Sequence, residues 1–172
     1  MTKKNLTHDD LPYRPCVGVV LFNRDGQVFL GKRNWKTDPE HREPDHLWQW
    51  PQGGIDKGED PLEAAKRELF EETNVSSISL IGEAPDWFHY DLQKEMLGIA
   101  LKGKYRGQTQ RWFAFRFEGE DSEIDVLSPG GGVHPAEFSE WRWGELSEAP
   151  ELVVPFKRPV YEQVVEAFRT LA

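Results

Sequence analysis

The sequence predicts an α/β protein, and the distribution of two kinds of apolar pattern carries this prediction. Segments typical of β-strands occur near the N-terminus and dominate the second half of the 172-residue chain, whereas helical periodicity is confined to one central and one terminal stretch. No internal repeat or linker divides these segments. We therefore expect residues 1–172 to form one domain, which at this length buries roughly 70% of the surface that the unfolded chain exposes.

A β-hairpin is expected close to the N-terminus. Residues 16–22 and 27–33 are two largely apolar runs, and Asp25-Gly26 between them supplies turn chemistry. The following segment, 36–46, contains two prolines and six charged residues. This composition predicts an exposed loop.

A central helix is predicted over residues 61–73. Asp60 is a suitable N-cap, Pro61 suits the first helical position, and Glu63 stands at the spacing of a capping box. After this helix the pattern changes to alternation, which predicts strands at 75–81, 87–90, 111–117 and 138–143.

The C-terminal part of the chain contains a glycine-rich loop and an amphipathic helix. Residues 128–134 read Ser-Pro-Gly-Gly-Gly-Val-His, which predicts a flexible loop. Apolar residues then recur at helical spacing and predict a terminal helix that packs on the sheet: Val160, Val164, Phe168 and Leu171.

Charge and composition exclude several classes of function. The net charge of −9 argues against a protein that coats duplex nucleic acid through a basic surface, because such binding depends on Lys and Arg displacing phosphate counterions. No apolar stretch approaches the ~20 residues needed to span a bilayer. Cys16 is the only cysteine, so no intramolecular disulfide forms. We therefore expect a cytoplasmic protein without membrane insertion; the oligomeric state stays open.

The central helix carries a dense acidic face. Glu68, Glu71 and Glu72 stand at i, i+3 and i+4, which confines the three carboxylates to an arc of about 100°. Like charges at this spacing destabilise a bare helix, whereas a hard divalent cation with oxygen ligands reverses the repulsion. An ordinary solvated acidic face is the alternative interpretation, and it is the commoner one for Glu-rich helices.

The longer string GGIDKGEDPLEAAKRELFEETNV, residues 53–75, favours the metal interpretation because it resembles the Nudix box. It departs from that box at Asn74, where the family usually has Gly. Asn is the next most tolerant residue for the left-handed turn that ends the helix, so we expect the geometry to survive.

The resemblance implies roles for the residues of the box. Glu68, Glu71 and Glu72 would hold magnesium, or manganese in its place. Arg67 would orient these carboxylates, and Gly53 and Gly54 would let the backbone pass close to the helix and the substrate phosphates.

A P-loop is a competing interpretation of another part of the chain. Gly26, Gly31 and Lys32 approach the P-loop spacing, but Arg33 replaces the metal-binding Ser or Thr. The intervening residues also read as a strand rather than a phosphate-binding loop.

Strings outside the box resemble the Nudix branch that acts on 5′-triphosphorylated RNA ends and on dinucleoside polyphosphates. They include Tyr13-Arg14-Pro15, residues 48–55, residues 107–113 and Phe156-Lys157-Arg158. The branch implies an α/β/α sandwich around a mixed sheet, with Glu137 as a further catalytic or metal-binding carboxylate. It also implies a set of substrate-binding residues: Arg14, Lys32, Gln52, Gly53, Gly54, Gln110, Phe156 and Lys157, with His134 and Tyr90 as candidate channel residues.

By this resemblance the chain is expected to be a metal-dependent hydrolase of a phosphoanhydride bond. The first interpretation is removal of pyrophosphate from a 5′-triphosphorylated RNA end, leaving a 5′-monophosphate. The alternative is asymmetric hydrolysis of diadenosine tetraphosphate, which needs the same acidic helix. A third possibility is a nucleotide-binding Nudix module without turnover.

Overall fold

The computed structural model describes residues 6–34 and 45–172, so most of the predicted loop 36–46 lies outside the described residues. The described elements are, in chain order, β1 (Tyr13–Phe22), β2 (Val28–Arg33), β3 (Trp48–Gln49), β4 (Gln52–Gly54), α1 (Pro61–Thr73), β5 (Ile78–Glu83), β6 (Phe88–Asp91), β7 (Gly107–Phe117), β8 (Phe138–Gly144), α2 (Ala149–Leu152) and α3 (Arg158–Phe168). Short 3₁₀ turns connect several of them.

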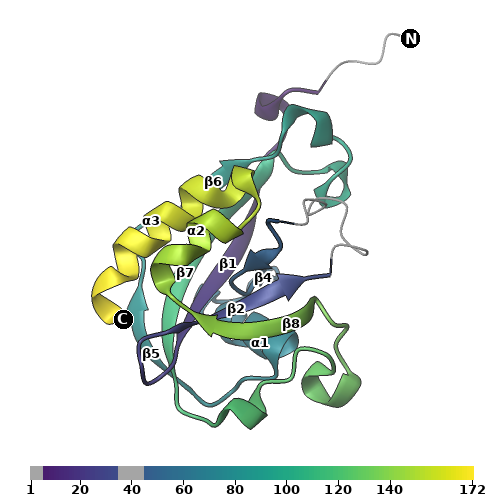
Figure 1. Ribbon diagram of the computed structural model, residues 1–172. Coiled ribbons are helices and arrows are strands. Elements are labelled where there is room, and N and C mark those ends of the chain that lie inside the picture. The colour runs from purple at the N-terminus through teal and green to yellow at the C-terminus, as the bar shows by residue number, and fades with distance from the viewer. Residues whose placement is uncertain (1–5, 35–44) are drawn as a thin grey trace.

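The strands form one mixed sheet built around β1 and β7 (Figure 1). The main path runs β3-β2-β1-β7-β5, with β4 paired to β1, β6 to β7 and β8 to β2. Among the described strands, β1 and β7 pair in parallel and the other pairs are antiparallel. The parallel register places Arg14 beside Gln108 and Gly18 beside Trp112.

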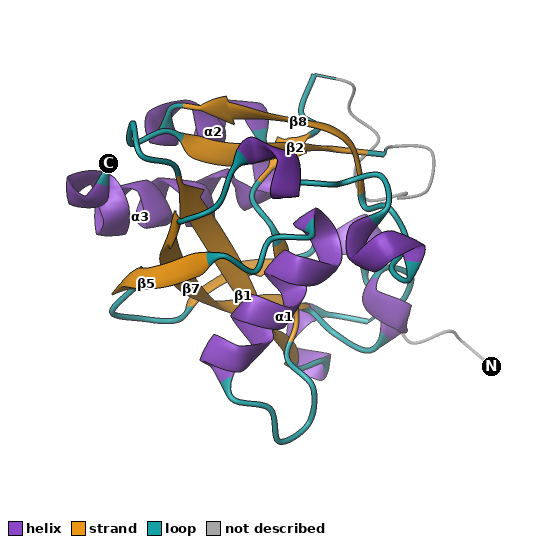
Figure 2. Ribbon diagram, turned by 90° about the horizontal axis from the view of Figure 1, so that it is seen from below, coloured by secondary structure: helices purple, strands orange, loops and turns teal. Residues whose placement is uncertain are grey.

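Helices cover both faces of this sheet (Figure 2). On one face, α1 buries Ala64, Ala65 and Leu69 against apolar residues of β1 and β7. On the other face, α3 buries Val160, Val164 and Phe168, and the predicted Leu171 packs against the same cluster. The α/β/α arrangement expected from the sequence is confirmed.

The predicted hairpin and the predicted N-cap of α1 are confirmed, but the second bond of the predicted capping box does not form, because the Glu63 carboxylate pairs with Lys66 at 3.5 Å. Phe22 pairs with Val28 across the predicted hairpin. Helix α1 has the predicted bounds, and the Asp60 carboxylate accepts a hydrogen bond from the Glu63 amide at 3.3 Å. Asn74 ends the helix with φ 69°, the left-handed conformation that a glycine would otherwise supply.

The predicted strand 75–81 is wrong for its first residues, because β5 begins at Ile78. The amides of Ser76 and Ser77 donate to the Glu123 carboxylate at 3.0 and 3.1 Å instead of to a neighbouring strand. Strand β7 begins earlier than predicted, at Gly107, because its N-terminal residues pair with β1.

Candidate active site

Helix α1 presents its acidic residues to a cavity of about 380 Å³ that β1, β4 and β7 help to form. The lining residues are Arg14, Arg33, Gln52, Gly53, Gly54, Glu68, Glu71, Glu72, Leu101, Gln108, Glu137 and Lys157. We call this the acidic-helix cavity. Most of the residues that the sequence predicted for the site are therefore brought together, although they come from both ends of the chain.

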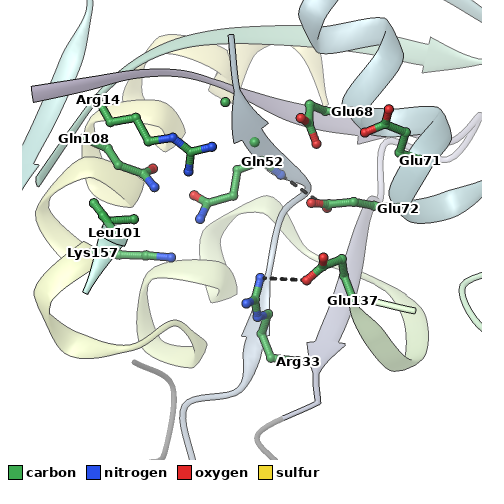
Figure 3. A pocket seen from close by; sticks show the side chains of 12 residues that line it. Arg14, Arg33, Gln52, Glu68, Glu71, Glu72, Leu101, Gln108, Glu137 and Lys157 are labelled. Carbon is green, nitrogen blue, oxygen red and sulfur yellow. Dashed lines mark hydrogen bonds and ion pairs between the residues drawn. The ribbon is translucent and has the colours of Figure 1, made fainter. Parts of the chain in front are cut away.

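The cavity has two ends of opposite character (Figure 3). Glu68, Glu71 and Glu72 project from α1 at one end. Arg14 and Lys157 lie at the other, where Gln108 adds an amide. A ligand that carries both phosphates and a divalent cation matches this separation of charge, because each end attracts one of its parts.

Glu137, which immediately precedes β8, also lines the cavity. Its carboxylate lies 3.8 Å from the Arg33 guanidinium, which β2 contributes. Figure 3 shows this pair below Glu72. The predicted fourth carboxylate is thus at the same site as the helix glutamates, although more than sixty positions separate it from Glu72 along the chain.

The two glycines of β4 leave room for charged side chains. A Cβ on Gly53 would collide with the Glu68 carboxylate, and a Cβ on Gly54 would collide with the Arg14 guanidinium. Glycine at both positions therefore lets β4 pass between these two side chains as they lie here, whereas a larger residue would displace the Glu68 carboxylate or the Arg14 guanidinium. The absence of a Cβ at Gly53 and Gly54 leaves room for the two charged side chains. This agrees with the close approach of backbone and helix that was expected from the sequence.

Arg67 lies beside the cavity rather than in its lining. Its guanidinium donates to Glu59 at 2.8 and 2.9 Å, to Glu68 at 2.9 Å, to Glu71 at 3.1 Å and to the Gly54 carbonyl at 2.8 Å. These contacts connect α1 to the loop before it and to β4. The orienting role predicted for Arg67 fits this geometry.

Burial and mutual repulsion perturb the acidic end. Burial raises the pKa of Glu68 to about 7, with the neighbouring Glu71 charge adding to the rise and Arg67 opposing it. Glu72 is 4% exposed, and burial together with the Glu68 charge raises its pKa well above the ordinary value. In both residues the protein disfavours the charged form in the absence of a counter-ion.

The donor chemistry of this end fits a hard divalent cation. The available ligands are carboxylate oxygens, and a cation would relieve the repulsion between Glu68 and Glu72. Within residues 6–34 and 45–172, no three acidic, histidine or cysteine side chains are already grouped as ligands of one ion. Glu68 and Glu71 each give one carboxylate oxygen to Arg67.

A chain of side-chain hydrogen bonds fixes two amides at the cavity. The Trp112 indole donates to Gln110 Oε1 at 3.1 Å. Gln110 Nε2 then donates to Gln52 Oε1 at 3.0 Å and to Gln108 Oε1 at 2.8 Å. Because an indole N–H is only a donor, the direction of every bond follows from Trp112. The amide nitrogens of Gln52 and Gln108 are left to face the cavity as donors.

Three predicted substrate-binding residues do not line the acidic-helix cavity. Gln110 is 1% exposed and lies behind Gln52 and Gln108. Lys32 pairs with Glu140 at 3.9 Å on the surface. Phe156 is partly buried, with its ring centroid 5.3 Å from that of Tyr90. The roles assigned to these residues stay predictions.

Arg33, Leu101 and Gln108 line the cavity although the sequence did not single them out. Gln108 and Gln110 are two residues apart and share a face of β7, but both precede residue 111, where the strand was predicted to begin. Arg33 adjoins Lys32, and its sequence context indicates only a departure from the P-loop pattern. Leu101 lies in a 3₁₀ turn that no sequence pattern indicated.

The sequence matches the NUDIX domain family over residues 12–164, and the chain belongs to this family. It is 61% identical to an RNA pyrophosphohydrolase of Azorhizobium caulinodans, over 95% of this chain and 96% of that protein. It is 58% identical to an RNA pyrophosphohydrolase of Rhizobium meliloti, over 96% of this chain and 99% of that protein. The resemblance drawn from the box and the outer strings is confirmed.

Solved structures show the same fold at lower identity. A C. elegans Ap4A hydrolase binary complex has a TM-score of 0.60 and 20% identity, with 92% of this chain and 99% of that chain covered. The E. coli dihydroneopterin triphosphate pyrophosphohydrolase has a TM-score of 0.61 and 21% identity, with 90% and 97% covered. Within the described ranges, no helix has the length and apolar character needed to cross a membrane.

The Glu59–Arg67 contact predicts a specific pH dependence of stability. The hydrogen bond from Arg67 lowers the pKa of Glu59 from 4.5 to about 2. Because the unfolded chain takes up this proton at higher pH, the stabilisation is complete above pH 4.5 and is lost as pH falls toward 2. We expect the difference in free energy of unfolding between wild type and Glu59→Gln to shrink on acidification. Urea unfolding at several pH values measures it, and a constant difference would contradict the prediction.

Proposed function

We propose that this protein removes pyrophosphate from the 5′-triphosphate end of RNA, in a reaction that requires magnesium or manganese. The observation that carries the proposal is the acidic-helix cavity, which places four carboxylates opposite Arg14 and Lys157. Relatives with 56–61% identity over nearly the whole chain bear the name RNA pyrophosphohydrolase. RNA as substrate implies that the enzyme works in the cytoplasm, on a strand end rather than on a duplex surface.

The cation would be held by Glu68, Glu71, Glu72 and Glu137. When bound, it supplies stabilisation of the negative charge that develops on phosphate oxygens during hydrolysis. Arg67 positions Glu68 and Glu71 through its hydrogen bonds to both. Gly53 supports the site by leaving space for the Glu68 carboxylate.

The opposite end of the cavity would bind the phosphates directly. Arg14 and Lys157 contribute positive charge, and Gln52 and Gln108 contribute amide donors whose direction Gln110 fixes. Water adds to phosphorus and the anhydride bond between the α- and β-phosphates breaks, which yields RNA 5′-monophosphate and pyrophosphate. The protein's own residues would therefore orient the triphosphate for this reaction.

Phe156 is proposed to contact a base near the 5′ end of the strand. Its ring lies next to Tyr90, and the Lys157 ammonium lies 5.9 Å from its centroid. Stacking on an aromatic ring tolerates any base, which suits an enzyme that acts on many transcripts. Lys32 lies outside the acidic-helix cavity, so it would contact the RNA strand there.

Removing a single carboxylate charge from α1 tests the metal role. Glu71→Gln and Glu72→Gln should each lower kcat by about 100-fold or more, because a bound cation supplies several kcal/mol of transition-state stabilisation. Glu63→Gln is the matched control, since Glu63 is exposed on the same helix outside the cavity. Activity within about twofold of wild type in both cavity variants would contradict the assignment.

The amide chain predicts an effect of Gln110 without direct contact. Gln110→Met removes the bonds that orient Gln52 and Gln108, whereas Gln110→Glu turns their carbonyl oxygens toward the phosphates. We expect kcat/KM on triphosphorylated RNA to fall in the order wild type, Met, Glu, with the Glu variant at least about tenfold below wild type. The uncharged Met variant controls for the added charge. Wild-type kcat/KM in both variants, at unchanged stability, would refute the positioning role.

The choice of substrate is tested by comparing wild type and Phe156→Ala on triphosphorylated RNA and on diadenosine tetraphosphate. Wild type should have the higher specificity constant on RNA. The substitution should cost roughly 1–3 kcal/mol in transition-state binding of RNA, and little for a free nucleoside triphosphate, which lacks the following base. A higher wild-type specificity constant for diadenosine tetraphosphate would overturn the proposed function.

A further inference from the structure

A second cavity, of about 370 Å³, adjoins the acidic-helix cavity. It is lined by Arg14, Ile55, Asp56, Lys57, Leu101, Lys102, Lys104 and Tyr105, and we call it the lysine pocket. Arg14 and Leu101 line both cavities, so the two spaces meet at these side chains. The lysine pocket therefore begins where the phosphate-binding end of the acidic-helix cavity stops.

The charge of the lysine pocket is opposite to that of the whole chain. It gathers four cationic side chains and one carboxylate, although the net charge of the protein is −9. The carboxylate, Asp56, lies 3.7 Å from the Arg67 guanidinium and is thus partly neutralised. This concentration of positive charge attracts a polyanion locally, on a protein whose net charge is negative.

The three lysines of the pocket have no carboxylate partner among the described residues. In the part of the chain that the structure describes, Lys57, Lys102 and Lys104 form no ion pair, whereas Lys32 and Lys66 each lie near a carboxylate. All three are exposed. Their ammonium groups are therefore available to an external ligand.

The backbone that carries two of the lysines has an unusual conformation. Leu101 and Lys102 have φ of 53° and 60°, a region that non-glycine residues seldom occupy. This conformation costs free energy and persists only where the surrounding structure imposes it. Leu101 lines both cavities, and Lys102 is exposed and lines the lysine pocket.

Tyr105 adds an aromatic ring to the same wall. The residue is partly buried and lines the pocket. Positive charge combined with an accessible aromatic side chain is the arrangement that binds single-stranded nucleic acid, because the charges follow the backbone and the ring accepts a base.

We infer that the lysine pocket binds backbone phosphates of the RNA strand downstream of its reacting 5′ end. The inference rests on the proposed function, since it extends the substrate from the acidic-helix cavity past Arg14 and Leu101. The chemistry recognised is the phosphate oxyanion. The strand backbone is its expected source, and the terminal phosphates of the substrate are the other source to be distinguished.

The test compares wild type with the double variant Lys102→Gln/Lys104→Gln on a triphosphorylated dinucleotide and a triphosphorylated octanucleotide. The control is Lys66→Gln/Lys94→Gln, which removes the same charge from exposed lysines outside both cavities. For the octanucleotide, KM should rise by about tenfold in the pocket variant and not in the control. The dinucleotide should keep its KM, and kcat should change little on either substrate.

Salt dependence gives a second readout. Each phosphate contact on a single strand contributes about 0.7 to the slope of log affinity against log salt, so loss of two contacts should reduce the slope for the octanucleotide by about 1.4. An equal rise in KM on both substrates, with weaker inhibition by pyrophosphate, would overturn the backbone assignment in favour of the terminal phosphates. Unchanged KM and slope on both substrates would overturn the site altogether. Failure of the wild type to hydrolyse either RNA would instead refute the proposed function.

Discussion

The acidic end of the site depends on the Arg67 guanidinium. Three carboxylates crowd one face of α1, and Glu68 and Glu72 are also removed from water. Arg67 offsets part of this repulsion through Glu68 and Glu71, and it ties the helix to Glu59 and to the Gly54 carbonyl. Burial nevertheless raises the pKa of Glu68 in spite of Arg67, and it raises the pKa of Glu72 as well. The remaining demand for positive charge is what a divalent cation would satisfy.

The other end depends on the central sheet. The parallel pairing of β1 and β7 sets Arg14 beside Gln108, and the antiparallel pairing of β1 and β4 brings Gln52 to the same place. Trp112, next to Gly18 in the register, then fixes the direction of the amide chain. A phosphate would therefore meet groups whose positions are set by the sheet, so little ordering is needed on binding.

Predictions that depend on a few adjacent residues, such as the N-cap and bounds of α1, are confirmed. Predictions that depend on residues distant in the sequence, such as the start of β5, are confirmed only in part. The cap at Asp60, the bounds of α1 and the left-handed Asn74 follow from rules that involve a few adjacent residues. The start of β5 was misplaced because Glu123, far along the chain, takes the Ser76 and Ser77 amides. For the site, the family resemblance identified the carboxylates and Arg14 but could not show that Gln110 lies behind the cavity.

By itself the sequence determined the acidic face of α1, since spacing of three and four residues places side chains together in any helix. It also determined the glycines of β4 as points of close approach, through their place in the box. Only the tertiary structure decided how Glu72 is buried, that Arg33 meets Glu137, and that Lys102 and Lys104 extend the cavity beyond Arg14. These features arise from strand register and from packing between distant segments, and the spacing of residues along the chain determines neither.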